Sequence, residues 1–134
     1  MSTDMWEHID DDRAVAAETV RVLRPGGRVL VAVPCSMNLW SGHDGALGHV
    51  RRYERDELVD LMESAGLTVR TVQSWNVLLR PIARMRRRGN ESTSEMEQVH
   101  PVLNAGLRAV VATERWLPVQ RLPGISLVVT AEKR

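Results

Sequence analysis

Several features of membrane and secreted proteins are missing from this 134-residue sequence. Its single cysteine, Cys35, excludes an internal disulfide framework and fits a reducing compartment. No apolar run approaches the roughly 18 to 20 residues that a membrane span needs, and the acidic N-terminal residues do not resemble a signal peptide. The formal net charge is +1, and 26% of the residues are charged. We therefore expect a cytoplasmic protein whose residues 1–134 form one domain.

Three stretches of strand length predict an α/β fold. Residues 28–33 (RVLVAV) are almost entirely apolar, which is typical of a strand covered on both faces, and Pro34 is expected to end its pairing. Residues 67–75 alternate roughly between β-branched and polar side chains, and residues 125–131 are again apolar. Helical spacing before the first strand and over residues 54–65 predicts two helices.

The order strand, helix, strand predicts that the first two strands are parallel and joined by a right-handed crossover. We expect the last strand to be antiparallel. Three recognisable strands make a thin sheet for residues this apolar, so the sheet is expected to be incomplete. Exposed sheet edges would then favour self-association.

Residues 76–122 predict a helical insertion before the final strand. This segment contains a cluster of five arginines: Arg80, Arg84, Arg86, Arg87 and Arg88. Apolar residues interleave with them, so the helix could lie on an anionic membrane surface, or the arginines could form a solvated helix face. Nucleic acid is not expected as a partner, because only Trp75 offers a stacking aromatic nearby.

Residues 35–53 show neither helical nor strand periodicity. A loop this long inside a small domain is more often functional than idle. In open α/β sheets, ligands bind beyond the carboxyl ends of the strands, which is where this loop begins. The loop is therefore the first place to look for a site.

Two segments carry a resemblance to a known family. WEHIDDDRAVAAETVRVLRPGGRVLVAVP (residues 6–34) resembles the segment of class I S-adenosylmethionine (SAM) dependent methyltransferases that leads from the fourth strand to the fifth. LWSGHDGALGHVRRYERDELVDLMESAGL (residues 39–67) resembles one branch of that family. The sequence is thus similar to the C-terminal half of a class I methyltransferase and implies an incomplete Rossmann-like methyltransferase sheet.

The resemblance implies SAM as cofactor, with Trp6, Glu7 and His8 bordering its pocket. The family binds SAM mainly through a glycine-rich loop after its first strand, which would precede Met1. No such loop follows a predicted strand in this sequence; Gly26 and Gly27 come before their strand and are expected to end a helix. The function implied is methyl transfer to a small-molecule or lipid-like acceptor, in a chain that lacks the cofactor-binding half. The alternative is a non-catalytic methyltransferase-like remnant or interaction module.

The loop contains the candidate catalytic and acceptor-binding residues. His43 and Asp44 are candidates for the general base that methyl transfer to oxygen or nitrogen requires, or for loop hydrogen bonds alone. The candidate acceptor-binding residues, each with a structural alternative, are Trp40, His49, Arg51, Arg52 and Tyr53. No metal site is expected, because His43 and His49 are six residues apart with one acid between them.

Overall fold

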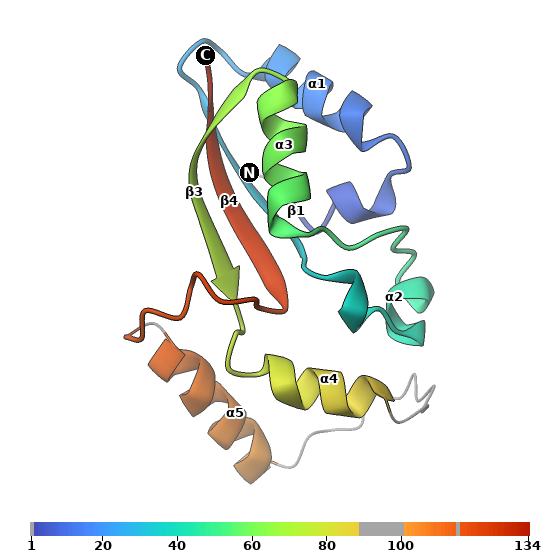
Figure 1. The fold of residues 1–134 in the computed structure, drawn as a ribbon, viewed down its shortest axis with the longest axis vertical. Coiled ribbons are helices and arrows are strands. Elements are labelled where there is room, and N and C mark those ends of the chain that lie inside the picture. The colour runs from blue at the N-terminus through green and yellow to red at the C-terminus, as the bar shows by residue number, and fades with distance from the viewer. Residues whose placement is uncertain (1, 89–100, 115) are drawn as a thin grey trace.

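A sheet of four strands, in the order β1-β2-β4-β3, forms the centre of the fold (Figure 1). The computed structural model describes residues 2–88, 101–114 and 116–134. The strands are β1 (Ser2–Thr3), β2 (Arg28–Pro34), β3 (Leu67–Trp75) and β4 (Ser126–Lys133). β4 lies between β2 and β3 and is antiparallel to both, so the predicted α/β class and antiparallel last strand are confirmed.

β2 and β3 are parallel to each other, as predicted, because both are antiparallel to the strand between them. The fourth strand, β1, was not predicted. It has only two residues and pairs in parallel with β2 through Ser2 with Val31 and Thr3 with Ala32. Two residues are too few to show a period of two, so nothing in their sequence could have identified them as a strand.

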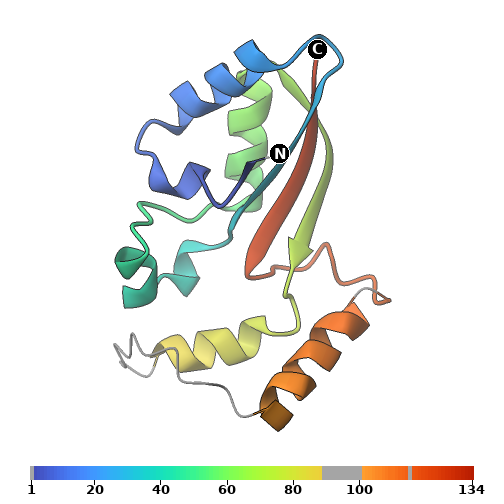
Figure 2. The ribbon, with the colours of Figure 1, turned by 180° about the vertical axis from the view of Figure 1, so that it is seen from behind.

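Helices cover one face of the sheet. α1 (Asp12–Val22) and α3 (Arg55–Ser64) both lie on the same side of it (Figures 1 and 2). Val29, Val31 and Val33 of β2 are buried in the core with residues of these helices. Leu30 and Ala32 point the other way and are only partly buried, and no helix among the described residues covers them. The expectation that this strand is covered on both faces is therefore not met within these residues.

Local interactions set the helix ends. Asp11 caps α1 by accepting a 2.9 Å hydrogen bond from the backbone of Ala14, as its position before the helix predicts. Gly26, at φ +71°, makes the turn between α1 and β2. The backbone of Glu54 donates to the carboxylate of Glu57 at the start of α3, a contact 3.4 Å long.

The chain pairs beyond Pro34, which corrects the prediction that this residue ends the ladder. The backbone N–H of Cys35 donates to Ile125 at 2.8 Å. At the other end of the loop, Tyr53 donates its backbone N–H to Pro34, and Ser36 donates back to Tyr53, each at 3.0 Å. Both ends of the loop 35–53 are thus fixed side by side at the carboxyl end of β2.

Two further helices lie beyond the carboxyl end of β3 (Figure 1). They are α4 (Arg80–Arg88) and α5 (Pro101–Glu114). Arg80 connects α4 to the segments just after β2 and just before β4, because its guanidinium donates to Ser36 Oγ at 3.4 Å and to the carbonyl of Gly124 at 2.9 Å. Within the predicted insertion, residues 89–100 and 115 lie outside the described residues. That residues 76–122 form an insertion into a single domain remains a proposal.

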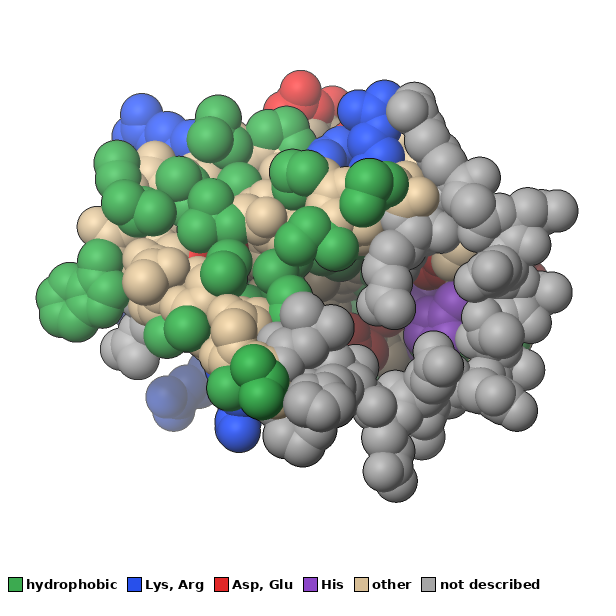
Figure 3. All heavy atoms as spheres, turned by 90° about the horizontal axis from the view of Figure 1, so that it is seen from below, with side chains coloured by type: hydrophobic (Ala, Val, Ile, Leu, Met, Phe, Trp, Pro, Cys, Tyr) green, Lys and Arg blue, Asp and Glu red, His purple; other side chains and the backbone are tan. Residues whose placement is uncertain are grey.

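None of the helices in the described parts of the chain has the length and apolar character that crossing a membrane would require. Seen from the end where α4 and α5 lie, the surface carries many hydrophobic side chains (Figure 3). Large apolar residues of the 75–122 region that are exposed include Trp75, Ile82, Met85, Val102, Trp116 and Leu122.

Candidate functional site

The segments that follow β1 and β2 meet at one edge of the sheet. A short 3-10 helix, η1 (Trp6–His8), follows β1, and the loop after β2 folds back against it. Val50 donates its backbone N–H to the carbonyl of Glu7 at 2.7 Å, and the hydroxyl of Tyr53 donates to the carbonyl of Trp6 at 3.3 Å. Because β1 and β2 are parallel, their carboxyl ends lie at the same edge, where open α/β sheets bind ligands.

Two short helices shape the loop itself: η2 (Met37–Leu39) and α2 (Gly42–Ala46). Asp44 stabilises the start of α2, since its Oδ2 accepts a 2.9 Å hydrogen bond from the backbone of Ser41. Ser36, just before η2, is buried at φ +67°, a backbone conformation that costs a non-glycine residue energy and often marks a functional segment. Ser36 was not among the predicted site residues, and its partner Arg80 was predicted only as part of the arginine cluster of a membrane-facing or solvated helix.

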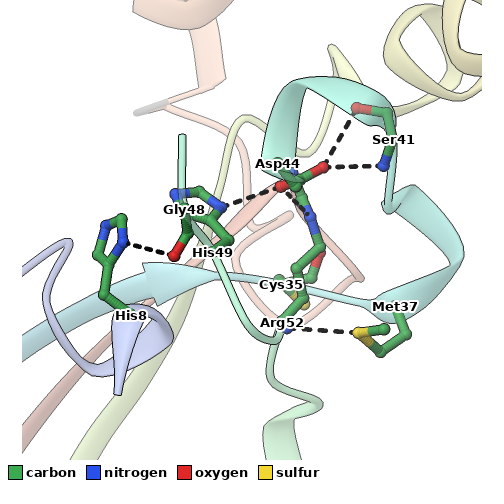
Figure 4. A network of polar contacts seen from close by, with 8 residues as sticks. All are labelled: His8, Cys35, Met37, Ser41, Asp44, Gly48, His49 and Arg52. Carbon is green, nitrogen blue, oxygen red and sulfur yellow. Dashed lines mark hydrogen bonds and ion pairs between the residues drawn. The ribbon is translucent and has the colours of Figure 1, made fainter. Parts of the chain in front are cut away.

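A buried ion pair holds the loop together (Figure 4). The side chains of Arg52 and Asp44 are 4% and 1% exposed, and Arg52 Nη2 lies 2.7 Å from Asp44 Oδ1. Arg52 also donates to the carbonyl of Cys35 at 3.2 Å. Burial alone would raise the pKa of Asp44, but the Arg52 guanidinium outweighs it and holds that pKa below its ordinary value. Asp44 is therefore ionised, and both of its carboxylate oxygens accept hydrogen bonds from neighbouring residues.

Asp44 also orients His49. The imidazole Nδ1 of His49 lies 3.1 Å from Asp44 Oδ1, and because that carboxylate is ionised, Nδ1 is the donor. His8 lies beside it, with ring centroids 4.8 Å apart in an edge-to-face arrangement. His8 Nδ1 is 3.0 Å from the carbonyl of Gly48, which can only accept (Figure 4). Both rings thus carry a proton on Nδ1, which leaves the lone pair on Nε2 in the neutral form of each imidazole.

The neighbouring Trp6 and Glu7 are fully buried. Neither oxygen of the Glu7 carboxylate has a hydrogen-bond partner among the described residues, and the same holds for Trp6 Nε1. Burial raises the pKa of Glu7 above its ordinary value, and the nearby Asp4 adds to that effect, while the nearby backbone N–H of Glu7 itself, and then His49 and His8, oppose it. Of the three residues expected to border a cofactor pocket, only His8 has an exposed side chain.

The remaining predicted residues occupy different environments. The side chain of His43 is exposed on α2 and makes no hydrogen bond with another described residue, and Trp40 is 37% exposed. Arg51 is held by the carboxylate of Asp12 and donates to the carbonyl of Asp10 at 2.6 Å. Tyr53 is fully buried. An acceptor could therefore reach His43 and Trp40 directly, whereas it would have to displace existing partners to reach Arg51 or Arg52.

A cavity of about 690 Å³ lies between the end of β3 and α5. Apolar residues contribute much of its lining, including Trp75, Leu107 and Val111. Its volume falls within the roughly 300 to 1,000 Å³ of typical small-molecule pockets. Sequence analysis predicted helices in this region but no cavity, because the cavity depends on how α5 lies against the strand end.

The Asp44–Arg52 pair makes a testable contribution to stability. Asp44→Asn leaves the Arg52 charge buried without a counter-ion, so we expect the free energy of unfolding to fall by about 3 to 5 kcal/mol at pH 7. Because the folded-state pKa of Asp44 lies below 3.8, the wild-type advantage is complete above that pH and is lost as the pH falls through the folded pKa. Denaturant unfolding of both proteins at pH 7 and in acid measures the difference.

The matched control is Glu18→Gln, which breaks an ion pair of similar length, 2.7 Å, between exposed Glu18 and Arg21. That change should leave the unfolding midpoint almost unaltered. Equal effects of the two substitutions, or an Asp44→Asn effect that does not shrink in acid, would show that the buried pair does not stabilise the loop.

Comparison with known proteins shows which sequences this chain is similar to. No family model matches the sequence. A probable S-adenosylmethionine-dependent methyltransferase of Mycolicibacterium smegmatis is 40% identical over 65 residues, which are 47% of this chain and 25% of that protein. The chain thus spans a quarter of the length of this curated relative.

Solved structures agree on the fold. A putative methyltransferase from Bacillus halodurans matches with a TM-score of 0.56 and 16% identity, over 98% of this chain and 67% of that one. A SAM-dependent methyltransferase from Mesorhizobium loti matches with a TM-score of 0.56 and 12% identity, over 98% of this chain and 59% of that one. This chain therefore has part of the fold of the SAM-dependent methyltransferases and is similar in sequence to one of them over about half of its length.

Proposed function

We propose that this chain takes part in SAM-dependent methyl transfer to a small-molecule or lipid-like acceptor, and that the loop 35–53 faces the acceptor. The observation that carries the proposal is the junction of η1 with this loop, where backbone hydrogen bonds bring the segments after two parallel strands to one edge. That edge is where ligands bind in open α/β sheets. The similarity to a probable methyltransferase supports the reaction class.

SAM would supply an electrophilic methyl group, and the acceptor must lose a proton as it attacks. We assign the proton acceptor to His43, because imidazole titrates near neutral pH and this side chain is exposed on α2. Asp44 does not act as a second base in this scheme, since Arg52 and His49 engage its carboxylate. Its role is to hold the helix that carries His43.

The proposal that the acceptor is lipid-like rests on the apolar residues around α4 and α5. Apolar side chains line part of the cavity beside α5, and Ile82 and Met85 are exposed on α4 next to the exposed Arg84. This arrangement suits peripheral contact with an anionic lipid surface. Arg80 would not contribute, because Gly124 and Ser36 engage it, and the side chains of Arg86, Arg87 and Arg88 lie outside the described part of the structure.

A non-catalytic interaction module is the second candidate. It is favoured by the partly exposed second face of the sheet and by exposed aromatic residues such as Trp116, which is 87% exposed. Exposed apolar surface of this kind often marks a protein interface. In that case the chain would keep its fold and associate with another chain without transferring a methyl group.

SAM binding tests whether this chain alone can hold the cofactor. We expect the isolated chain to bind SAM more weakly than the low micromolar range, because no glycine-rich loop follows a strand within these 134 residues. Isothermal titration of the purified chain with SAM measures this. A low micromolar dissociation constant for the monomer would contradict the expectation and show that the described residues suffice for the cofactor.

The assignment of the base is tested in a preparation that transfers methyl groups, obtained by fusing the chain to a SAM-binding half or by adding a partner chain. His43→Ala should lower kcat by roughly 10² to 10⁴ and leave SAM affinity unchanged, since general-base catalysis contributes about that factor. Trp40→Ala is the companion variant and should act mainly on the KM of the acceptor. Unchanged turnover in His43→Ala, with a lower thermal stability, would show that this histidine is structural.

A further inference from the structure

We propose that Glu7, His8 and His49 bind a divalent transition-metal ion, with Zn²⁺ as the type case. One candidate ligand atom from each of the three residues lies within 4.8 Å of the other two. Sequence analysis paired His49 with His43 and expected no metal. The structure instead places His49 against the η1 segment, where a histidine and a glutamate are adjacent. The inference goes beyond the proposed methyl transfer, because binding of the ion requires neither SAM nor an acceptor.

The two imidazoles are arranged as metal ligands usually are. A ligating histidine almost always donates its second ring N–H to a carboxylate or a backbone carbonyl, which fixes its tautomer and orientation. His49 donates to Asp44 and His8 donates to the carbonyl of Gly48, so in the neutral imidazole the lone pair of each ring is on Nε2, where a metal would bind. The supporting carboxylate is itself fixed by Arg52, as Figure 4 shows.

The carboxylate of Glu7 is the third ligand, and its buried surroundings favour a bound cation. It is fully buried and its oxygens have no hydrogen-bond partner among the described residues. Buried carboxylates in proteins are normally paired, hydrogen-bonded or coordinated to a metal. The two arginines of the loop cannot neutralise it, because Arg51 is paired with Asp12 and Arg52 with Asp44.

Spacing and donor type select the class of ion. Zinc ligands lie about 2.0 to 2.2 Å from the metal, which separates tetrahedral ligands by about 3.3 Å, so the three side chains, whose candidate ligand atoms lie within 4.8 Å of one another, would have to move closer together to bind the ion. Two imidazoles and one carboxylate favour Zn²⁺ and similar transition metals, whereas Mg²⁺ and Ca²⁺ prefer sites built from oxygen. The exposed side chain of His8 gives the ion a route in, and three protein ligands leave a fourth position open.

The test is titration of the full-length chain, stripped of metal with a chelator and carrying no histidine tag, with ZnCl₂ and separately with CoCl₂. We expect one equivalent to bind with a low micromolar or tighter dissociation constant, and Zn²⁺ to raise the melting temperature. Bound Co²⁺ should give the visible absorption of a four- or five-coordinate site. Glu7→Gln and His49→Ala should each weaken binding by at least about 100-fold, since loss even of a supporting group costs 10- to 100-fold.

His43→Ala is the matched control, because it removes an exposed histidine of the same loop and should leave metal affinity unchanged. Glu7→Gln also shows whether a loss of binding is due to misfolding. With chelator present, this change removes a buried carboxylate that has no hydrogen-bond partner among the described residues, so the variant should melt no lower than the wild type. Absence of saturable binding would overturn the proposal. So would binding that survives both Glu7→Gln and His49→Ala, or binding that only His43→Ala abolishes.

Discussion

The ion pair between Asp44 and Arg52 fixes the geometry on which the candidate site depends. Removing two charges from water is costly, and their attraction offsets that cost only when further hydrogen bonds satisfy the remaining polar atoms. Here Ser41, His49 and the carbonyl of Cys35 provide those bonds. Such a pair adds little net stability compared with apolar packing, but few other arrangements of the loop could satisfy the same groups. Its main effect is to specify one conformation.

That conformation connects the two strand ends. By orienting His49, the carboxylate of Asp44 places one imidazole beside His8, which belongs to a segment near the N-terminus. Arg80 extends the same network toward α4 through the strained Ser36. The loop 35–53 is therefore joined to the η1 segment on one side and to α4 on the other by side-chain and backbone contacts.

Local sequence patterns determined most of what could be predicted about the fold. Apolar runs and helical spacing located β2, β3, β4, α1 and α3, because these features depend on residues close in sequence. The insertion of β4 between β2 and β3, and the two-residue β1, depend on tertiary pairing and have no local signal.

The site was harder to predict for a specific geometric reason. His43 and Asp44 are adjacent in sequence, which suggested a pair, but neighbouring residues on a helix point in different directions. Asp44 turns inward to Arg52 and His49, while His43 faces solvent. The contact between His8 and His49 joins distant segments, and only the folded chain reveals it.

Amide hydrogen exchange on the chain and its Asp44→Asn variant tests most directly whether the buried pair holds the site. The account predicts that the amides of Val50 and Tyr53 are protected in the wild type and lose that protection in the variant, while Val129 in β4 keeps it. Rapid exchange of Val50 and Tyr53 in the wild type, or protection that the substitution does not change, would contradict the account.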